Sequence, residues 1–405
     1  MSGYTSPHIS GTDYCKFISN PAKDMYFTLE ESFWYDIAKQ LDKKILILCD
    51  RTMYSIPATL AFYKELTQSE FKPDLVIILF ACELNLMGIN SDTQTEGHKN
   101  LEQGKKLMLK QNADIRTLYD SIQEPKVILS SDPNQTDPYY NIIHFNLFYF
   151  LTYNHVTKVI PSQHKQHKLS CLNRVARPSR IHMFTNLIKE DFFKDVYFSF
   201  HGLGLTKTKS GNILMATNIV PKALYEYMGP SRVALSDTEL QNIDNTLKQH
   251  WHLLPIRAQD RSEYSPRDKE QHPGLDVNDA YSDSVCNIAT ETTTWWADSN
   301  VFLTEKTFKP IALGMPFFIQ ASSGSIAYLR QQGFDVYDDV LDHSYDTEVD
   351  YAKRQTMLMN SIRTFMQTDY TRDIDREKRN IEHFYSDETY NSYFDPFIEQ
   401  LKNII

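Results

Sequence analysis

The sequence is poor in cysteine, and it lacks the cysteine patterns that mark secreted or zinc-binding proteins. Only five cysteines occur in 405 residues. Their odd number and wide spacing give no disulfide framework and no Cys/His zinc pattern. Several lie in or beside apolar runs, which is typical of buried thiols in a reducing compartment. The five are Cys15, Cys49, Cys82, Cys171 and Cys286.

Long apolar runs are also missing. The most apolar window, residues 139–153, is interrupted by Asn141, His144 and Asn146 and is too short to cross a bilayer. The first thirty residues are polar and mixed, so they predict no secretory signal. We therefore expect a cytoplasmic protein without a membrane partner.

Positive charge is in deficit over the whole chain but not in every part of it. The net charge of −10 argues against a general nucleic-acid coat. Residues 161–210 nevertheless carry nine Lys or Arg against three Asp or Glu, whereas residues 331–405 carry eight against sixteen. The basic segment is either a solvated surface or an anion-binding region.

The common catalytic motifs are absent. There is no Walker loop, no GxSxG elbow and no HExxH, so kinase and hydrolase functions lack support. The His201–Gly204 segment lacks the downstream glycine of a dinucleotide fingerprint. The Asp-x-Asp at residues 373–375 lies in a charged helical tail, which favours a solvated face over a metal site.

What the chain does contain is an alternation of short apolar runs and amphipathic segments. Apolar runs at residues 43–50, 72–80 and 126–132 end in or near a carboxylate, the pattern of buried parallel strands. This alternation predicts a doubly wound α/β domain with ligand-facing loops at the strand carboxyl ends. A polar break at residues 162–167 predicts domains over residues 1–163 and 164–370, with a C-terminal helical tail over 371–405 that packs back on the body.

A second feature is a cluster of arginines after an apolar strand. Arg174, Arg177 and Arg180 recur every three residues, which places them roughly on one face of a helical turn. Guanidinium groups bind phosphates bidentately. The cluster is therefore either a phosphate site or an ordinary basic surface turn.

The stretch from Asn287 to Arg330 carries the most informative pattern. Thr304 is a predicted helix N-cap, and Glu305 and Lys306 fall in the first turn, where backbone N–H groups and the helix dipole favour an anion. A carboxylate such as Glu305 suits the vicinal hydroxyls of a ribose, and Lys306 suits a phosphate. The alternative is a solvated Glu-Lys pair at a helix start.

The segment from Glu291 to Ile319, with its Phe302-Leu303-Thr304-Glu305-Lys306 core, resembles the donor-site signature of the fucosyltransferase-like glycosyltransferases. The order LNRVARPSR, FLTEK and GFDVYDDVLDHSYD is also similar to uncharacterised sugar-transferase-like proteins of tailed phages. For a phage protein the cytoplasm is that of the host.

The resemblance implies a GT-B fold, in which two Rossmann-like domains face each other across a cleft. It implies a nucleoside-diphosphate sugar held by the C-terminal domain and an acceptor held by the N-terminal one, with no metal and no further cofactor. Glu305 would bind the ribose, Lys306 the diphosphate, and Glu291 the donor sugar. The implied donor-binding set is Arg174, Arg177, Glu291, Thr292, Thr304, Glu305 and Lys306.

An inverting transfer also needs a general base on the acceptor hydroxyl. Asp50 and Glu83 are the candidates, with Asp132 as the third, because each follows a predicted strand of the first domain. A hydroxymethylated base in phage DNA is one acceptor, and a glycan or a protein are the alternatives. A non-catalytic nucleotide- or carbohydrate-binding module of the same fold and a structural interaction protein are the competing functions.

Overall fold

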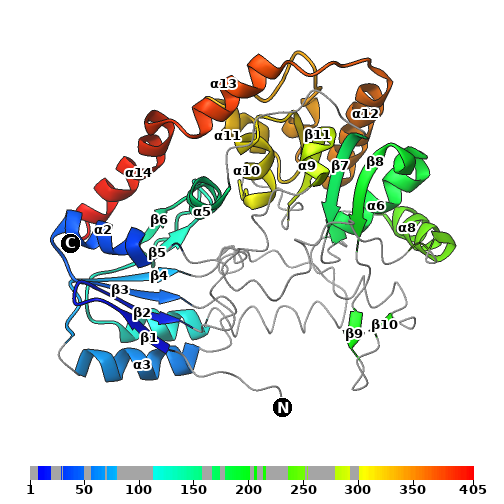
Figure 1. The fold of residues 1–405 in the computed structure, drawn as a ribbon. Helices are drawn as coiled ribbons and strands as arrows, with labels where there is room; N and C mark the ends of the chain where they lie inside the picture. The colour runs from blue at the N-terminus through cyan, green and yellow to red at the C-terminus, as the bar shows by residue number, and fades with distance from the viewer. Residues whose placement is uncertain are drawn as a thin grey trace. The chain divides into compact units, whose positions relative to one another are not determined.

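The computed structural model describes twelve stretches of the chain and two isolated residues, Leu29 and Leu253 (Figure 1). Two compact units are present, Met1–Leu151 together with Tyr390–Ile405, and Thr152–Thr389. The sequence-predicted boundary at residues 163 and 164 lies outside the described residues. Those described are 8–19, 29, 31–49, 56–68, 71–79, 113–156, 167–173, 178–200, 205–207, 213–215, 236–250, 253, 279–291 and 301–405.

The first unit contains a sheet in the order β1-β2-β3-β4-β5-β6. β1 is antiparallel to β2, and every other neighbouring pair is parallel. Among the described strands the spatial order follows the chain order, so the sheet has no reversal. Its strands are β1 (His8–Gly11), β2 (Cys15–Ser19), β3 (Ile45–Cys49), β4 (Leu75–Leu79), β5 (Lys126–Ser130) and β6 (Ile142–His144).

Helices cover this sheet because its strands are apolar on both faces, as parallel strands generally are. Leu46, Leu48 and Ile78 pack with Tyr63 of α3, while Figure 1 shows α2 on the other side of the sheet. There Trp34 of α2 lies 5.5 Å from Phe145, ring centre to ring centre. The helices of this unit are α2 (Glu31–Leu41), α3 (Ile56–Gln68), residues 113–121, and the parts of α5 (Leu147–His155) and α14 (Asp387–Lys402) that lie within its bounds.

The C-terminal helix α14 contributes to the core of the first unit. Its Phe397 lies 4.5 Å from Phe145, and its Tyr393 lies 4.4 Å from Tyr149, between ring centres. Aromatic pairs at these distances add about 0.5–1.5 kcal/mol each beyond their area burial. Residues far apart in the sequence therefore close one core.

The second unit contains a parallel sheet in the order β12-β11-β7-β8. Buried side chains on one of its faces pack with α6, α8 and α12. The elements are β7 (His167–Asn173), α6 (Pro178–Lys189), η2 (Phe192–Lys194), β8 (Val196–Phe200), α8 (Asp237–His250), α9 (Asp279–Ser282), β11 (Ser284–Thr290), α10 (Glu305–Ala312), β12 (Phe317–Gln320), α11 (Ser325–Gln331), η6 (Ser344–Thr347), α12 (Tyr351–Gln367) and α13 (Ile374–Phe384). A small antiparallel pair, β9 (Leu205–Lys207) and β10 (Ile213–Met215), completes the described strands.

Two parallel or mostly parallel sheets flanked by helices confirm the predicted mixed α/β class. Within the described ranges no helix is both long enough and apolar enough to cross a membrane.

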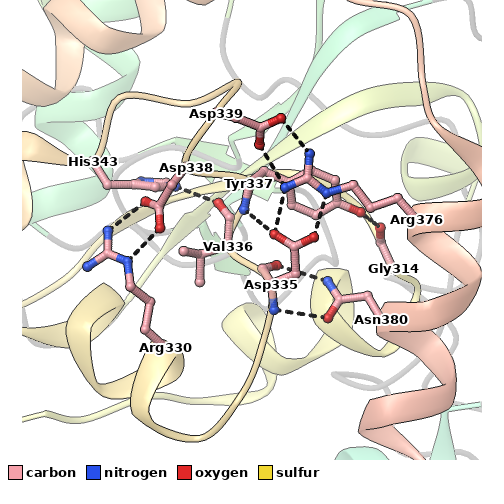
Figure 2. A network of polar contacts seen from close by, with 10 residues as sticks. All are labelled: Gly314, Arg330, Asp335, Val336, Tyr337, Asp338, Asp339, His343, Arg376 and Asn380. Carbon is pink, nitrogen blue, oxygen red and sulfur yellow. Dashed lines mark hydrogen bonds and ion pairs between the residues drawn. The ribbon is translucent and has the colours of Figure 1, made fainter.

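A network of polar contacts ties α13 to the segment that follows α11 (Figure 2). Arg376 of α13 bonds Asp335 at 2.5 and 2.7 Å and Asp339 at 2.7 Å. Its guanidinium also lies 4.2 Å from the centre of the Tyr337 ring, and the Tyr337 hydroxyl donates to the carbonyl of Gly314. Gly314 follows α10, so this network fixes the far end of that helix.

A buried histidine makes the stability of the second unit sensitive to acid. Burial lowers the pKa of His182 from its ordinary 6.5 to about 4, and its Nδ1 lies 3.2 Å from the Tyr351 hydroxyl. The unfolded chain accepts a proton near pH 6.5 and the folded protein does not. His182 therefore costs no stability above pH 6.5, and the free energy of unfolding falls as the pH falls from 6.5 towards 4.

We expect His182 to account for about 2 kcal/mol of lost stability between pH 7 and pH 5. Denaturant unfolding of the wild type and His182→Gln at both pH values measures this directly. On acidification, His182→Gln should lose about 2 kcal/mol less stability than the wild type. An identical loss in both proteins would show that His182 is not the cause.

Candidate functional site

The carboxyl ends of the second sheet carry a row of buried polar side chains. Asn173, Thr290 and Gln320 are the last residues of β7, β11 and β12, and none is more than 2% exposed. The Thr290 hydroxyl donates to the Asn173 side-chain oxygen. Buried polar side chains also lie within the strands, where Asn287 Nδ2 donates to Ser170 Oγ at 2.9 Å.

The same edge contains a reversal of strand order. From β7 the chain adds β8 on one side, and then β11 and β12 on the other. The reversal therefore lies between the carboxyl ends of β7 and β11. In open α/β sheets ligands bind at such a switch point.

Glu291 follows β11 directly and holds the start of α10. Its side chain is completely buried and accepts hydrogen bonds from Thr304 N at 2.9 Å, Thr304 Oγ1 at 2.6 Å and Thr307 Oγ1 at 2.6 Å. Thr304 has extended backbone angles, and its Oγ1 accepts from Lys306 N, which makes it the predicted N-cap. A buried carboxylate thus meets the positive end of α10 and fixes where the helix begins.

Glu305 and Lys306 form an ion pair on the outer side of this helix start. Lys306 Nζ lies 2.6 Å from Glu305 Oε1 and 3.1 Å from Thr304 Oγ1, and the two charged side chains are 24% and 17% exposed, lysine first. Burial acts to raise the pKa of Glu305, but the charge of Lys306, with a smaller effect from Lys309, outweighs it and holds the pKa below its ordinary value. The carboxylate is therefore charged at neutral pH.

No family model, curated protein or solved structure matches this chain. The function therefore has to be argued from the site itself.

Lys309 is a cation near the site that the sequence reasoning missed. It is only 8% exposed, and its ammonium lies 5.0 Å from the centre of the Tyr281 ring, a cation–π distance. Lys309 follows Glu305 by one helical turn. That i, i+4 spacing is the signal that would have placed both residues on one face of α10.

Several predicted site residues lie outside the described part of the chain. Their predicted roles stay predictions. They are Asp50, Glu83, Arg174, Arg177 and Thr292.

Asp132, the third candidate base, is described and lies in a turn after β5. It is buried, its Oδ1 accepts from Asn134 N at 3.0 Å, and its own N–H donates to Ser130 Oγ at 3.1 Å. These contacts form a tight local turn at the carboxyl edge of the first sheet. Asp132 therefore lies just after a strand, and its role as a general base remains a prediction.

The Asp-x-Asp of the tail serves helix α13. Asp373 is its N-cap and accepts from Arg376 N at 2.9 Å, and Asp375 is a highly exposed partner of Lys378 at 3.5 Å. Among the residues with described positions, no three His, Cys, Asp or Glu side chains form a group that could hold a metal ion.

Proposed function

We propose that the second unit binds a nucleoside-diphosphate sugar and that the protein transfers the sugar to an acceptor hydroxyl as a GT-B glycosyltransferase. The observation that carries the proposal is the placement of Glu305 and Lys306 after β11, beside the strand-order reversal between β7 and β11. A carboxylate and an ammonium there suit the ribose and the diphosphate of one nucleotide.

Donor binding in this proposal exchanges partners within the ion pair. A diphosphate oxygen replaces Glu305 as the partner of the Lys306 ammonium. The Glu305 carboxylate, released from Lys306, then accepts from the two ribose hydroxyls. In the absence of ligand, Glu305 and Lys306 neutralise each other, so the exchange favours a ligand that carries both a ribose and a diphosphate over one that carries a diphosphate alone.

Transfer breaks the bond between the sugar C1 and the diphosphate oxygen as the acceptor oxygen attacks C1. Negative charge develops on the leaving diphosphate, where Lys306 and Lys309 stabilise it. The acceptor hydroxyl loses its proton to a general base, for which Asp50 and Glu83 remain the proposed residues and Asp132 the third. Glu291 holds α10 so that the cations are in place before the donor arrives.

The test is release of free nucleotide from a panel of nucleoside-diphosphate sugars. Lys306→Ala and Glu305→Ala are each expected to reduce release at least tenfold, since a hydrogen bond to a charged group contributes about 1.5–3 kcal/mol. Lys402→Ala, which removes the 2.6 Å surface pair with Glu399, is the matched control and should retain wild-type release. Nucleotide binding without turnover, with every acceptor tried, would instead indicate a binding module.

The acceptor proposed from the phage resemblance is a hydroxymethylated base in DNA. Transfer of labelled sugar to hydroxymethylcytosine DNA, with unmodified DNA as the control, tests it. If the label appears on a glycan or a protein and not on DNA, DNA is not the acceptor. The proposed donor site would be unaffected by that result.

A further inference from the structure

Two buried carboxamides meet at the carboxyl end of β12. Gln320 Nε2 donates to Gln355 Oε1 of α12 at 2.7 Å, and the two residues are 2% and 3% exposed. Gln320 Oε1 and Gln355 Nε2 have no hydrogen-bond partner among the described residues. If both amides are turned over, the same contact forms with the roles exchanged, so one donor and one acceptor stay unused in either orientation.

A third polar group beside them is also unused. Ser322 is 2% exposed, and its Oγ has no partner in the part of the chain that the structure describes. A buried polar group without a partner costs about 1–3 kcal/mol, so three such groups, two in contact and the third two residues after Gln320, are unusual in a folded protein.

The turn that carries Ser322 is held on both sides, because Gly324 N donates to the carbonyl of Asp346 at 2.9 Å and Ser325 Oγ donates to the carbonyl of Ser322 at 2.8 Å. Arg354 Nε donates to the carbonyl of Ala321 at 3.1 Å. At the other end, a Cβ added to Gly324 would meet no heavy atom within 4 Å. Binding of a base to the two buried carboxamides therefore requires this turn to shift.

The main chain of Gln320 is connected to the start of α10 through Glu291. Glu291 N donates to the carbonyl of Gln320 at 3.0 Å, and the Glu291 carboxylate bonds Thr304. Gln320 and the Thr304–Lys306 turn are thus joined through one residue. When the ribose and the diphosphate of a nucleotide bind Glu305 and Lys306, the base of that nucleotide still needs a binding site.

We propose that Gln320 and Gln355, with Ser322, recognise the base of the donor nucleotide. This inference rests on the proposed function. Nucleobases present an N–H donor next to a carbonyl or ring-nitrogen acceptor, and a carboxamide pair with one free acceptor and one free donor is complementary to such an edge. In protein–DNA contacts a bidentate amide–base pair discriminates by about 1–3 kcal/mol, or roughly tenfold to a hundredfold.

The experiment compares the affinities of UDP, GDP, ADP, CDP and pyrophosphate by titration calorimetry. The wild type is expected to prefer one base at least tenfold. Gln355→Met, an apolar replacement of similar size, should reduce that preference to about threefold or less while leaving pyrophosphate affinity unchanged. Gln367→Met, at the exposed end of the same helix α12, is the matched control and should keep the wild-type preference.

A second variant, Gln355→Glu, replaces the free donor with an acceptor and is expected to change which base is preferred. Unchanged pyrophosphate affinity shows that each variant is folded. Wild-type base preference in both Gln355 variants would overturn the inference and leave the proposed function standing. Failure of the wild type to bind pyrophosphate and every nucleoside diphosphate would overturn both.

Discussion

Replacing Glu291 with alanine is expected to lower the free energy of unfolding by about 3–5 kcal/mol and to abolish nucleotide binding. The carboxylate accepts three hydrogen bonds from Thr304 and Thr307 in a fully buried position. Removing it leaves those donors unsatisfied, at about 1–3 kcal/mol each, and creates a cavity. The start of α10 then loses the anchor that sets Glu305 and Lys306 in place.

Chemical denaturation and nucleotide titration of Glu291→Ala measure the two effects. Glu291→Gln keeps the shape and one acceptor oxygen, so its loss of stability should be clearly smaller. Glu190→Ala is the control for removing a less buried carboxylate, one that pairs with Arg363 at 2.6 Å. Wild-type nucleotide affinity in Glu291→Ala would show that α10 does not depend on this residue.

The second large effect is expected from Gly314→Ala, which should destabilise the second unit by about 3–5 kcal/mol. Gly314 has φ 67°, a left-handed conformation that costs an L-residue about 1–2 kcal/mol. An added Cβ would lie 2.8 Å from the carbonyl carbon of Glu377 and overlap its oxygen. Glu377 itself is buried in an ion pair with Arg372, so α13 cannot move away cheaply.

Gly324→Ala is the matched control, because it has φ 82° and open space around the added Cβ. Gly324→Ala should lower stability only by the cost of a left-handed conformation for alanine, about 1–2 kcal/mol. Thermal and denaturant unfolding of the two variants isolate the steric contribution at Gly314. Equal stabilities would mean that the contact with α13 is not maintained in solution.

Local signals in the sequence were sufficient for individual elements, such as two strands of the first sheet and the start of α10. The apolar run at residues 43–50 contains β3, and the run at 72–80 contains β4, because continuous apolarity over a short length is how a buried parallel strand appears in sequence. Thr304 caps α10 as predicted, and the helix ends at Ala312.

Contacts between elements far apart in the sequence could not be predicted from such local signals. The sequence gives no order for β12, β11, β7 and β8, so the reversal between β7 and β11 could not be predicted. The contact between Gln320 and Gln355 joins residues 35 positions apart on different elements. The capping bonds from Thr304 and Thr307 to Glu291 likewise depend on how the segment between them folds back.

The most direct test of the donor site is a thermodynamic cycle between Glu305 and the ribose hydroxyls. A nucleoside diphosphate and its 2′,3′-dideoxy form are titrated into the wild type and into Glu305→Gln. We predict that loss of the diol weakens binding about tenfold or more in the wild type and about threefold or less in the variant. The same loss in both proteins would mean that Glu305 does not bind the ribose and would contradict the proposed donor site.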